Sequence, residues 1–285
     1  MRPLYQLLVL SCAMFAFTAS ASAAMVDWST QSWSAGSLSN SYDVDPSNPG
    51  NDVTITVSGD TGQLQPAAGT GQQTPAITSN LEGGFGAGHM SLQLAIDLTS
   101  NAQGITVTID FSALYANGVA NVSFNLFDID MADTGGNGSG SHYVDVIRSI
   151  YATSITGTQI APTITGLGAN VSFSGSGTNQ VLTGIASTAD TGSTSADANA
   201  TISFNATNIR SITFTYGDNS MFADPTYQHI ALDNISYSVV PEPSYLGACA
   251  AVVFLAIWSS GRCSKMARKC SVSQADGGRA LRSTS

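Results

Sequence analysis

Aspartates interrupt the apolar pattern of this chain at two places. In residues 122–126 the apolar side chains share one face of an expected strand, and Asp128 and Asp130 continue that face. From Phe127 onward the apolar residues move to the other face, so either a β-bulge shifts the register or the carboxylates end the row. Asp233 likewise stands in line with the apolar residues of the last alternating run. Because a bare buried charge is costly, such carboxylates must be hydrogen-bonded or bind a cation.

Four aspartates therefore predict a structural Ca²⁺ site. Asp128, Asp130 and Asp133 are close in sequence, and Asp233 is expected on a neighbouring strand. Calcium is bound by about six to eight oxygen atoms from carboxylates, carbonyls and water. The spacing differs from an EF-hand, because the loop has neither a glycine at its sixth position nor a glutamate at its twelfth. The alternative is that these aspartates cap backbone amides at strand ends.

Recognisable catalytic patterns are absent from residues 25–238. The histidines His89, His142 and His229 form no close metal-binding pair, and the sequence has no nucleophile elbow or phosphate loop. Glycoside hydrolysis needs two carboxyl groups about 5 to 10 Å apart. Glu82 and an aspartate are a candidate pair, but the many acidic side chains make some pairing expected by chance. We predict a non-catalytic protein, with a secreted glycan-degrading enzyme as the alternative.

Short alternating runs position these residues. Period-two patterns rich in β-branched and aromatic residues are typical of half-buried strands. Glycine-rich breaks separate the runs, and no helical stripe occurs between residues 25 and 240. The sequence therefore predicts an all-β fold, an antiparallel β-sandwich of jelly-roll or lectin-like type. The runs are 53–57, 105–111, 122–126, 143–147, 202–204, 212–216 and 235–239.

The charge of this middle region excludes some partners. It contains two arginines, no lysine and 17 acidic residues, a formal net charge of −15. Such a field repels nucleic acid and anionic lipid, so we predict no nucleic-acid binding. It also contains no cysteine, because the four cysteines lie nearer the two ends, and no disulfide is expected to stabilise the fold. The cysteines are Cys12, Cys249, Cys263 and Cys270.

The N-terminal residues 1–24 are typical of a secretory signal peptide. Arg2 is followed by an apolar stretch of about 14 residues from Leu4 to Phe17 and then by an Ala-x-Ala site. We expect the Sec translocon to export the chain and signal peptidase to cleave it after Ala23 or Ala24.

A second targeting pattern lies near the C-terminus. Pro241, Glu242 and Pro243 precede an uncharged apolar stretch, 244–261, whose length is at the lower limit for a transmembrane helix. A basic cluster follows and is expected to stay cytoplasmic by the positive-inside rule. The cluster comprises Arg262, Lys265, Arg268 and Lys269.

This order of motif, apolar helix and basic cluster, over residues 239–270, resembles the PEP-CTERM sorting signal of Gram-negative bacteria that make exopolysaccharide. The resemblance implies that the helix anchors the protein in the inner membrane and that an exosortase then recognises Pro241, Glu242 and Pro243 and processes the tail. Family tails usually stop soon after the basic cluster, whereas this chain continues through 271–285, a polar segment expected to be disordered. A plain C-terminal membrane anchor is the alternative.

The ectodomain expected between the two signals is 25–238. Segments 126–130 and 230–235 resemble strands of PEP-CTERM ectodomains and, more loosely, of lectin-like or carbohydrate-binding jelly rolls. The resemblance implies an exported, exosortase-sorted protein of the cell surface or extracellular matrix, with exopolysaccharide as the candidate ligand.

Two further features bear on a ligand site, and each has two interpretations. Trp28 and Trp33 could stack on sugar rings or pack on the core. The long loops 60–88 and 187–200 could lie beside a ligand, as loops at the ends of a sandwich often do, or serve as spacers.

Overall fold

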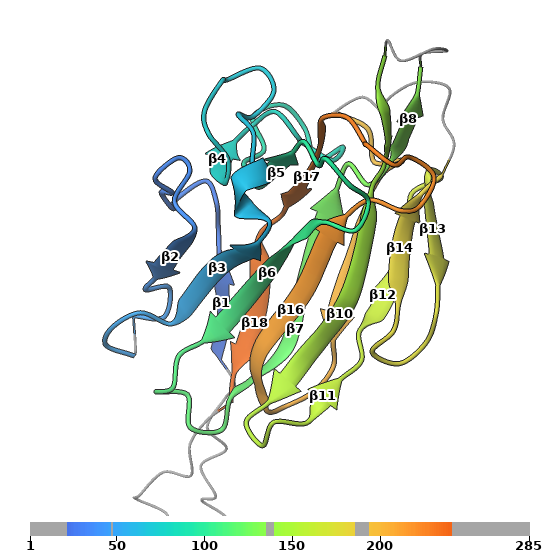
Figure 1. Cartoon of the computed structure of the whole chain (residues 1–285). Coiled ribbons are helices and arrows are strands. Elements are labelled where there is room, and N and C mark those ends of the chain that lie inside the picture. The colour runs from blue at the N-terminus through green and yellow to red at the C-terminus, as the bar shows by residue number, and fades with distance from the viewer. Residues whose placement is uncertain (1–21, 47, 135–139, 186–193, 241–285) are drawn as a thin grey trace, which may run out of the picture. The chain divides into compact units, whose positions relative to one another are not determined.

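The structure, a computed structural model, describes residues 22–46, 48–134, 140–185 and 194–240 (Figure 1). Within these ranges the only helical segment is one 3-10 turn, η1 (Thr61–Gln63), and all other regular elements are β-strands. The prediction of an all-β fold is therefore confirmed for the part of the chain that the structure describes.

One antiparallel layer is built around β16 (Ile209–Gly217), and we call it the β16 layer. It faces the viewer in Figure 1. The short strand β11 (Gln159–Ile160) pairs with β10 (Val146–Ser154) of this layer. In order across the sheet, the strands are β2 (Ser39–Tyr42), β3 (Val53–Gly59), β6 (Gly104–Phe111), β16, β10 (Val146–Ser154), β14 (Val181–Gly184) and β13 (Val171–Ser174).

The other layer is built around β7 (Val119–Phe127), and we call it the β7 layer. On one side β7 pairs first with β18 (Ile235–Val239) and then with β17 (Gln228–Leu232). A single backbone bridge, Ile209 with Val119, links the two layers. The prediction of an antiparallel β-sandwich is confirmed, in a jelly-roll-like arrangement. The remaining strands of this layer are β4 (Ala76–Thr78), β5 (Ser91–Ile96), β1 (Ser22–Val26), β15 (Ala200–Phe204) and β12 (Thr163–Thr165).

A separate two-stranded hairpin, β8 (Met131–Asp133) with β9 (His142–Val144), follows β7. At the other side of the β7 layer, β1 pairs along β18, with Ser22 opposite Val239. The first described residue of the chain therefore lies beside the last but one.

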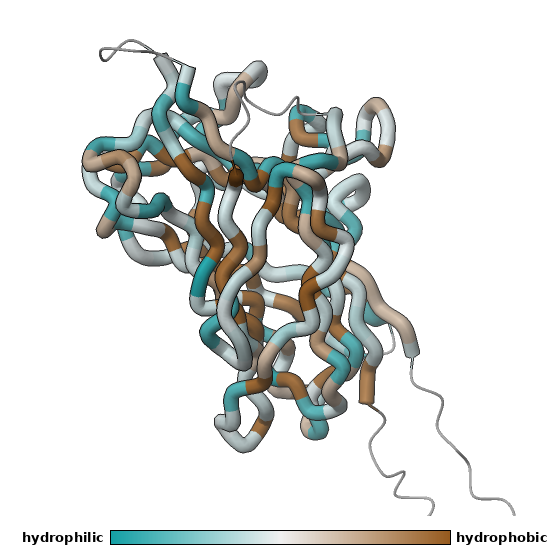
Figure 2. Tube along the Cα trace, turned by 90° about the vertical axis from the view of Figure 1, so that its right-hand side faces the viewer, coloured by the Kyte–Doolittle hydropathy of each residue, from teal (hydrophilic) through white to brown (hydrophobic). Residues whose placement is uncertain are grey.

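The space between the layers holds the main hydrophobic core. In β6 the residues Ile105, Val107 and Ile109 are buried, and the residues between them point outward. Phe124 of β7 and Phe214 of β16 meet across the core with ring centroids 6.2 Å apart. Hydrophobic and polar residues alternate along the strands in Figure 2, as expected for sheets with one buried face.

The predicted targeting segments lie almost entirely outside the described residues. Of the signal peptide 1–24 only the last three residues are described, and they belong to β1. Of the sorting segment 239–270 only Val239 and Val240 are described, and the tail 271–285 is outside. Among the described residues, no helix is long and apolar enough to cross a membrane. The expected span 244–261 is not among them.

Packing across the two layers is the source of stability that this cysteine-free region offers. We predict that Phe124→Ala lowers the free energy of unfolding by about 3–5 kcal/mol, because it removes a buried ring and leaves a cavity. Chemical denaturation measures the change. Ser58→Ala on the exposed end of β3 is the control, with an expected change below about 0.5 kcal/mol. An equal loss in both variants would contradict this placement of the core.

Candidate functional site

Three of the four aspartates that predict calcium each pair with a different histidine. Nε2 of His229 lies 2.9 Å from Oδ2 of Asp128. Nδ1 of His142 lies 3.0 Å from Oδ1 of Asp133.

The third pair is the shortest. Nε2 of His89 lies 2.7 Å from Oδ1 of Asp233. Sequence analysis gave these histidines no role, because in each pair the histidine is distant from its aspartate in the sequence or separated from it by a loop.

The parity change after Phe127 has a backbone cause. Strand β7 ends at Phe127, and Asp128 adopts a positive φ of 65°. This left-handed residue turns the chain so that Ile129 enters the core between the layers. Of the two interpretations open at the sequence level, the carboxylate at the end of the strand is the one that the structure supports.

Asp130 belongs to a buried group beside Asp145. The hydroxyl of Tyr143 donates to Oδ1 of Asp130 at 3.1 Å, and the backbone N–H of Asp130 donates to Oδ2 of Asp145 at 3.1 Å. The hydroxyl of Tyr216 donates to Oδ1 of Asp145 at 2.7 Å. Burial raises the pKa of Asp145 well above its ordinary value, and the nearby charge of Asp130 raises it further.

Asp218 is a second fully buried carboxyl near this group. It accepts hydrogen bonds from the backbone N–H groups of Val144 at 2.8 Å and Asn219 at 2.6 Å. Burial raises its pKa from 3.8 to about 6, although these two hydrogen bonds and the charge of Arg148 act in the opposite direction.

The structure does not bring the predicted calcium ligands Asp128, Asp130, Asp133 and Asp233 into one group. In the described residues, no three or more histidine, cysteine, aspartate or glutamate side chains are arranged to hold a metal ion. The partners of these carboxylates include side chains, namely three histidines, Asn125 and the Tyr143 hydroxyl, whereas the alternative expected them to cap backbone amides. Calcium binding stays a prediction, and melting temperatures with added calcium and with EDTA would test it.

A row of polar and aromatic side chains crosses the outer face of the β7 layer. Oγ1 of Thr201 donates to Oδ1 of Asn125 at 2.7 Å, and Nδ2 of Asn125 donates to Oδ2 of Asp233 at 2.8 Å. Asp233 pairs with His89, and the His89 ring stacks on Phe85 with centroids 5.1 Å apart. We call these five residues the aromatic–carboxylate site. Phe85 is 57% exposed, so its ring is open to a ligand.

The sheet positions three of these residues. Asn125 on β7 and Thr201 on β15 are directly paired in register, and both alternate with core residues, so they point outward. Asp233 lies in the break between β17 and β18, and its backbone N–H donates to the carbonyl of Asn125. This backbone hydrogen bond and the strand register together place the Asn125 amide beside the Asp233 carboxylate.

The other two residues lie on the segment between β4 and β5, which packs on the same face. Leu81 contacts Phe127 and Ala231 in a small hydrophobic cluster outside the main core. Gly83 has a φ of 54° and leaves no room for a side chain against the Phe127 ring. Nδ2 of Asn199 donates to the carbonyl of Gly83 at 2.7 Å. The segment that carries Phe85 and His89 is therefore held against the β7 layer through Leu81 and Gly83.

Glu82, the only glutamate of the domain, shapes this segment. Its Oε1 accepts a hydrogen bond from the backbone N–H of Gly88 at 2.8 Å, which closes the turn between Phe85 and His89. Segment 60–88, for which the sequence allowed either a loop beside a ligand or a spacer, contains η1 and β4, and Phe85 of the candidate site lies near its C-terminal end.

Trp28 and Trp33 pack on the core, which is the second of the two interpretations that the sequence allowed. Trp28 is 1% exposed and packs edge-on against Tyr42 with centroids 5.8 Å apart. Trp33 is also buried, and its Nε1 donates to the carbonyl of Ser37 at 3.0 Å. Both rings belong to the core, so neither offers a face for stacking on a sugar.

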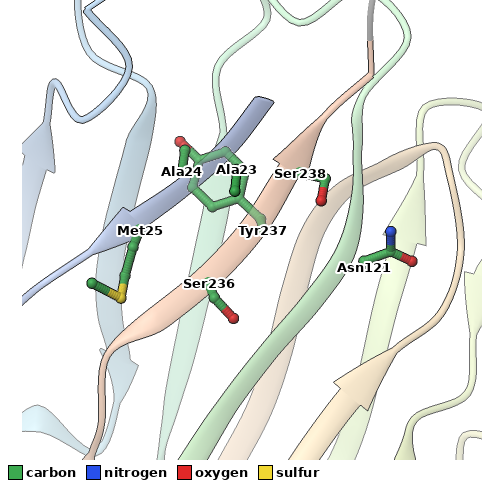
Figure 3. A pocket seen from close by; sticks show the side chains of 7 residues that line it. All are labelled: Ala23, Ala24, Met25, Asn121, Ser236, Tyr237 and Ser238. Atoms are coloured by element: carbon green, nitrogen blue, oxygen red, sulfur yellow. The ribbon is translucent and has the colours of Figure 1, made fainter. Parts of the chain in front are cut away.

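A groove of about 390 Å³ lies farther along the β7 layer. Figure 3 shows Ser236 and Ser238 on β18, with Met25 on the neighbouring β1 and Asn121 on β7. Ala23, Ala24 and Tyr237 complete its lining.

The predicted sorting residues lie outside the described residues. These are Pro241, Glu242, Pro243, Arg262, Lys265, Arg268 and Lys269.

Comparison with known proteins assigns no family, because the sequence matches no family model and no curated protein. Among solved structures, the chain is similar to a family 11 carbohydrate-binding module from Clostridium thermocellum in complex with a β-1,3-1,4-mixed-linked tetrasaccharide. The two are 13% identical over 77% of this chain and 96% of that one, with a TM-score of 0.29. It is also similar to TmCBM27, a carbohydrate-binding module studied for mannan recognition, at 13% identity over 78% of this chain and 100% of that one, with a TM-score of 0.31. Likeness of this degree decides neither ligand nor activity.

The raised pKa of Asp218 predicts a stability that depends on pH. Because the pKa is about 6 in the fold and 3.8 ordinarily, the folded state binds more protons between these values. The stabilising contribution is full below pH 3.8 and is lost as the pH rises through about 6.

We predict that Asp218→Asn makes unfolding free energy fall less between pH 4 and 6 than in the unsubstituted protein, by roughly 1–2 kcal/mol. Urea titrations at several pH values measure the slope. The exposed Asp97→Asn is the matched control. Identical slopes for the Asp218 variant and the unsubstituted protein would show that Asp218 does not retain its proton in the fold.

Proposed function

We propose that this chain is an exported, non-catalytic protein of the cell surface or extracellular matrix whose β-sandwich binds polysaccharide. An exosortase processes its C-terminal segment 239–270 at Pro241-Glu242-Pro243. The binding part of the proposal rests on the aromatic–carboxylate site, and the sorting part rests on the sequence at the two ends.

The observation that carries the binding proposal is an exposed ring beside fixed polar groups. A sugar presents apolar C–H faces and a rim of hydroxyls, so it suits a site with an aromatic surface and a few placed hydrogen-bonding groups. Phe85 supplies the surface, and the His89 ring stacks against it. Asn125, Asp233 and Thr201 supply amide, carboxylate and hydroxyl groups on the same face.

The sorting proposal places the motif directly after the last strand of the described fold. Strand β18 ends at Val239, two residues before Pro241.

Removal of the aromatic surface tests the binding proposal. We predict that Phe85→Ala weakens binding to polysaccharide by about tenfold, because the stacking surface is lost while the polar groups remain. Affinity electrophoresis against a panel of soluble polysaccharides measures it.

Leu114→Ala is the matched control, because Leu114 is as exposed as Phe85 and precedes β7 at the end away from Phe127. Equal binding by the two variants would contradict the site. A panel in which no polysaccharide is retained would contradict the proposed function itself.

Substitution of the motif tests the sorting proposal. We predict that replacing Pro241, Glu242 and Pro243 with alanine leaves the protein unprocessed and in the membrane fraction of a host with an exosortase. Immunoblots of fractionated cells compare its size and location with the unsubstituted protein. Ser58→Ala serves as a control outside the motif. Normal processing of the motif variant would leave a plain membrane anchor as the better explanation.

A further inference from the structure

The outer face of the β7 layer continues from the aromatic–carboxylate site to the groove in Figure 3. Along β7, Asn125, Ser123 and Asn121 alternate with buried residues and point outward. On the neighbouring β18, Ser236 and Ser238 do the same. On β7 and β18, the outward side chains between the two features are therefore small and uncharged.

The serine hydroxyls along this path are held by hydrogen bonds, and each can still form further hydrogen bonds. Oγ of Ser123 and Oγ of Ser203 are 3.0 Å apart, and Oγ of Ser236 donates to the carbonyl of Ser123 at 3.1 Å. A hydroxyl can donate one hydrogen bond and accept two. Ser123 and Ser203 are half-buried and Ser236 is exposed, so each can still bind a ligand hydroxyl.

The distance between the two features exceeds one sugar ring. Asn125 belongs to the aromatic–carboxylate site and Asn121 lines the groove, four residues earlier on the same strand. At a rise of about 3.3 Å per residue, the path is about 13 Å long. A ligand that contacts both features must therefore be an oligosaccharide or a polysaccharide chain.

The charge around this path selects against anions. Both arginines of the described residues project from the β16 layer, where they donate to backbone carbonyls: Arg148 to Asp218 and Gln103, and Arg210 to Ser112 and Tyr115. The domain has no lysine and a net charge of −15. An acidic polysaccharide would meet no cationic side chain on this face other than a protonated histidine, and would be repelled over a longer range.

We propose that the ligand is an uncharged glycan chain that lies along β7 and β18, with one end on Phe85 and the other in the groove beside Ser236 and Ser238. This inference rests on the proposed polysaccharide-binding function and specifies its ligand class and its second contact. Cleavage after Ala23 or Ala24 would shorten the β1 wall of the groove but would keep Met25 and the walls on β18 and β7.

The test uses the exported protein as recovered from expressing cells. Its binding is measured by calorimetry to neutral polymers (mannan, mixed-linked β-glucan and starch) and to acidic ones (alginate and polygalacturonate). Oligosaccharides of the best neutral polymer, from disaccharide to hexasaccharide, are then compared. We expect binding to a neutral polymer only, with affinity rising about tenfold from disaccharide to hexasaccharide.

Variants at Phe85 and in the groove test separately the two proposed contacts with the glycan chain. Ser238→Ile fills the groove with a β-branched side chain that suits a strand, and we expect it to abolish the gain in affinity with length while disaccharide binding persists. Phe85→Ala is expected to weaken binding at every length. Ser58→Ile, on the exposed end of β3 in the other layer, controls for a new apolar surface. Melting temperatures verify that each variant is folded.

The outcomes distinguish this inference from the function on which it rests. Tighter binding to the acidic polymers, or affinity that does not depend on length, would overturn the neutral extended chain and leave polysaccharide binding in place. A gain with length that survives in Ser238→Ile would remove the groove from the site. No binding to any polymer by the unsubstituted protein would overturn the proposed function as well.

Discussion

The fold has to bury carboxylates with almost no cations to pair them. Seven aspartates are at most 6% exposed, and both arginines of the region are used on backbone carbonyls. Because an unpartnered buried charge costs several kcal/mol, hydroxyls, backbone amides and histidines must take the place of arginine and lysine. Asp52 illustrates the solution, since it accepts from the backbone N–H groups of Val44 and Asp45 and from the hydroxyl of Tyr115. Each such carboxylate ties the end of a strand to a segment distant in sequence.

The aromatic–carboxylate site is one consequence of this constraint. Asp233 interrupts the path from β17 to β18, and its two oxygens are satisfied by Asn125 and His89. The bond to Asn125 fixes the break against β7, and the bond to His89 holds the segment after β4 on the outer face. Phe85 then lies over that face because it stacks on His89 and contacts Phe127. A bond that stabilises the fold thus also positions the exposed ring.

Sequence patterns predicted the half-buried strands well, because their alternation follows directly from one buried face. The runs 53–57, 105–111, 122–126 and 212–216 all lie within strands β3, β6, β7 and β16. Strand β5 was missed although Leu92, Leu94 and Ile96 alternate there with smaller or polar residues, and the structure buries both of its faces. The aspartates were recognised as exceptional, but their partners were not: His89 and Asp233 are 144 residues apart, and only the fold brings them together. Phe85 in a glycine-rich segment carried no local sign of its role.

The contacts that hold the aromatic–carboxylate site in place also affect how strongly a site of this kind can bind a ligand. Ordering a loop at the moment of binding subtracts from affinity, roughly 0.5–1.5 kcal/mol for each side chain immobilised. Here the loop is already held by the contact of Gly83 with Phe127 and by the bond from Asn199, and the polar groups are held by one another. Little ordering therefore remains for a ligand to impose. A shallow face with one exposed ring can accordingly retain a long chain through several weak contacts, because each contact meets a group that is already in place.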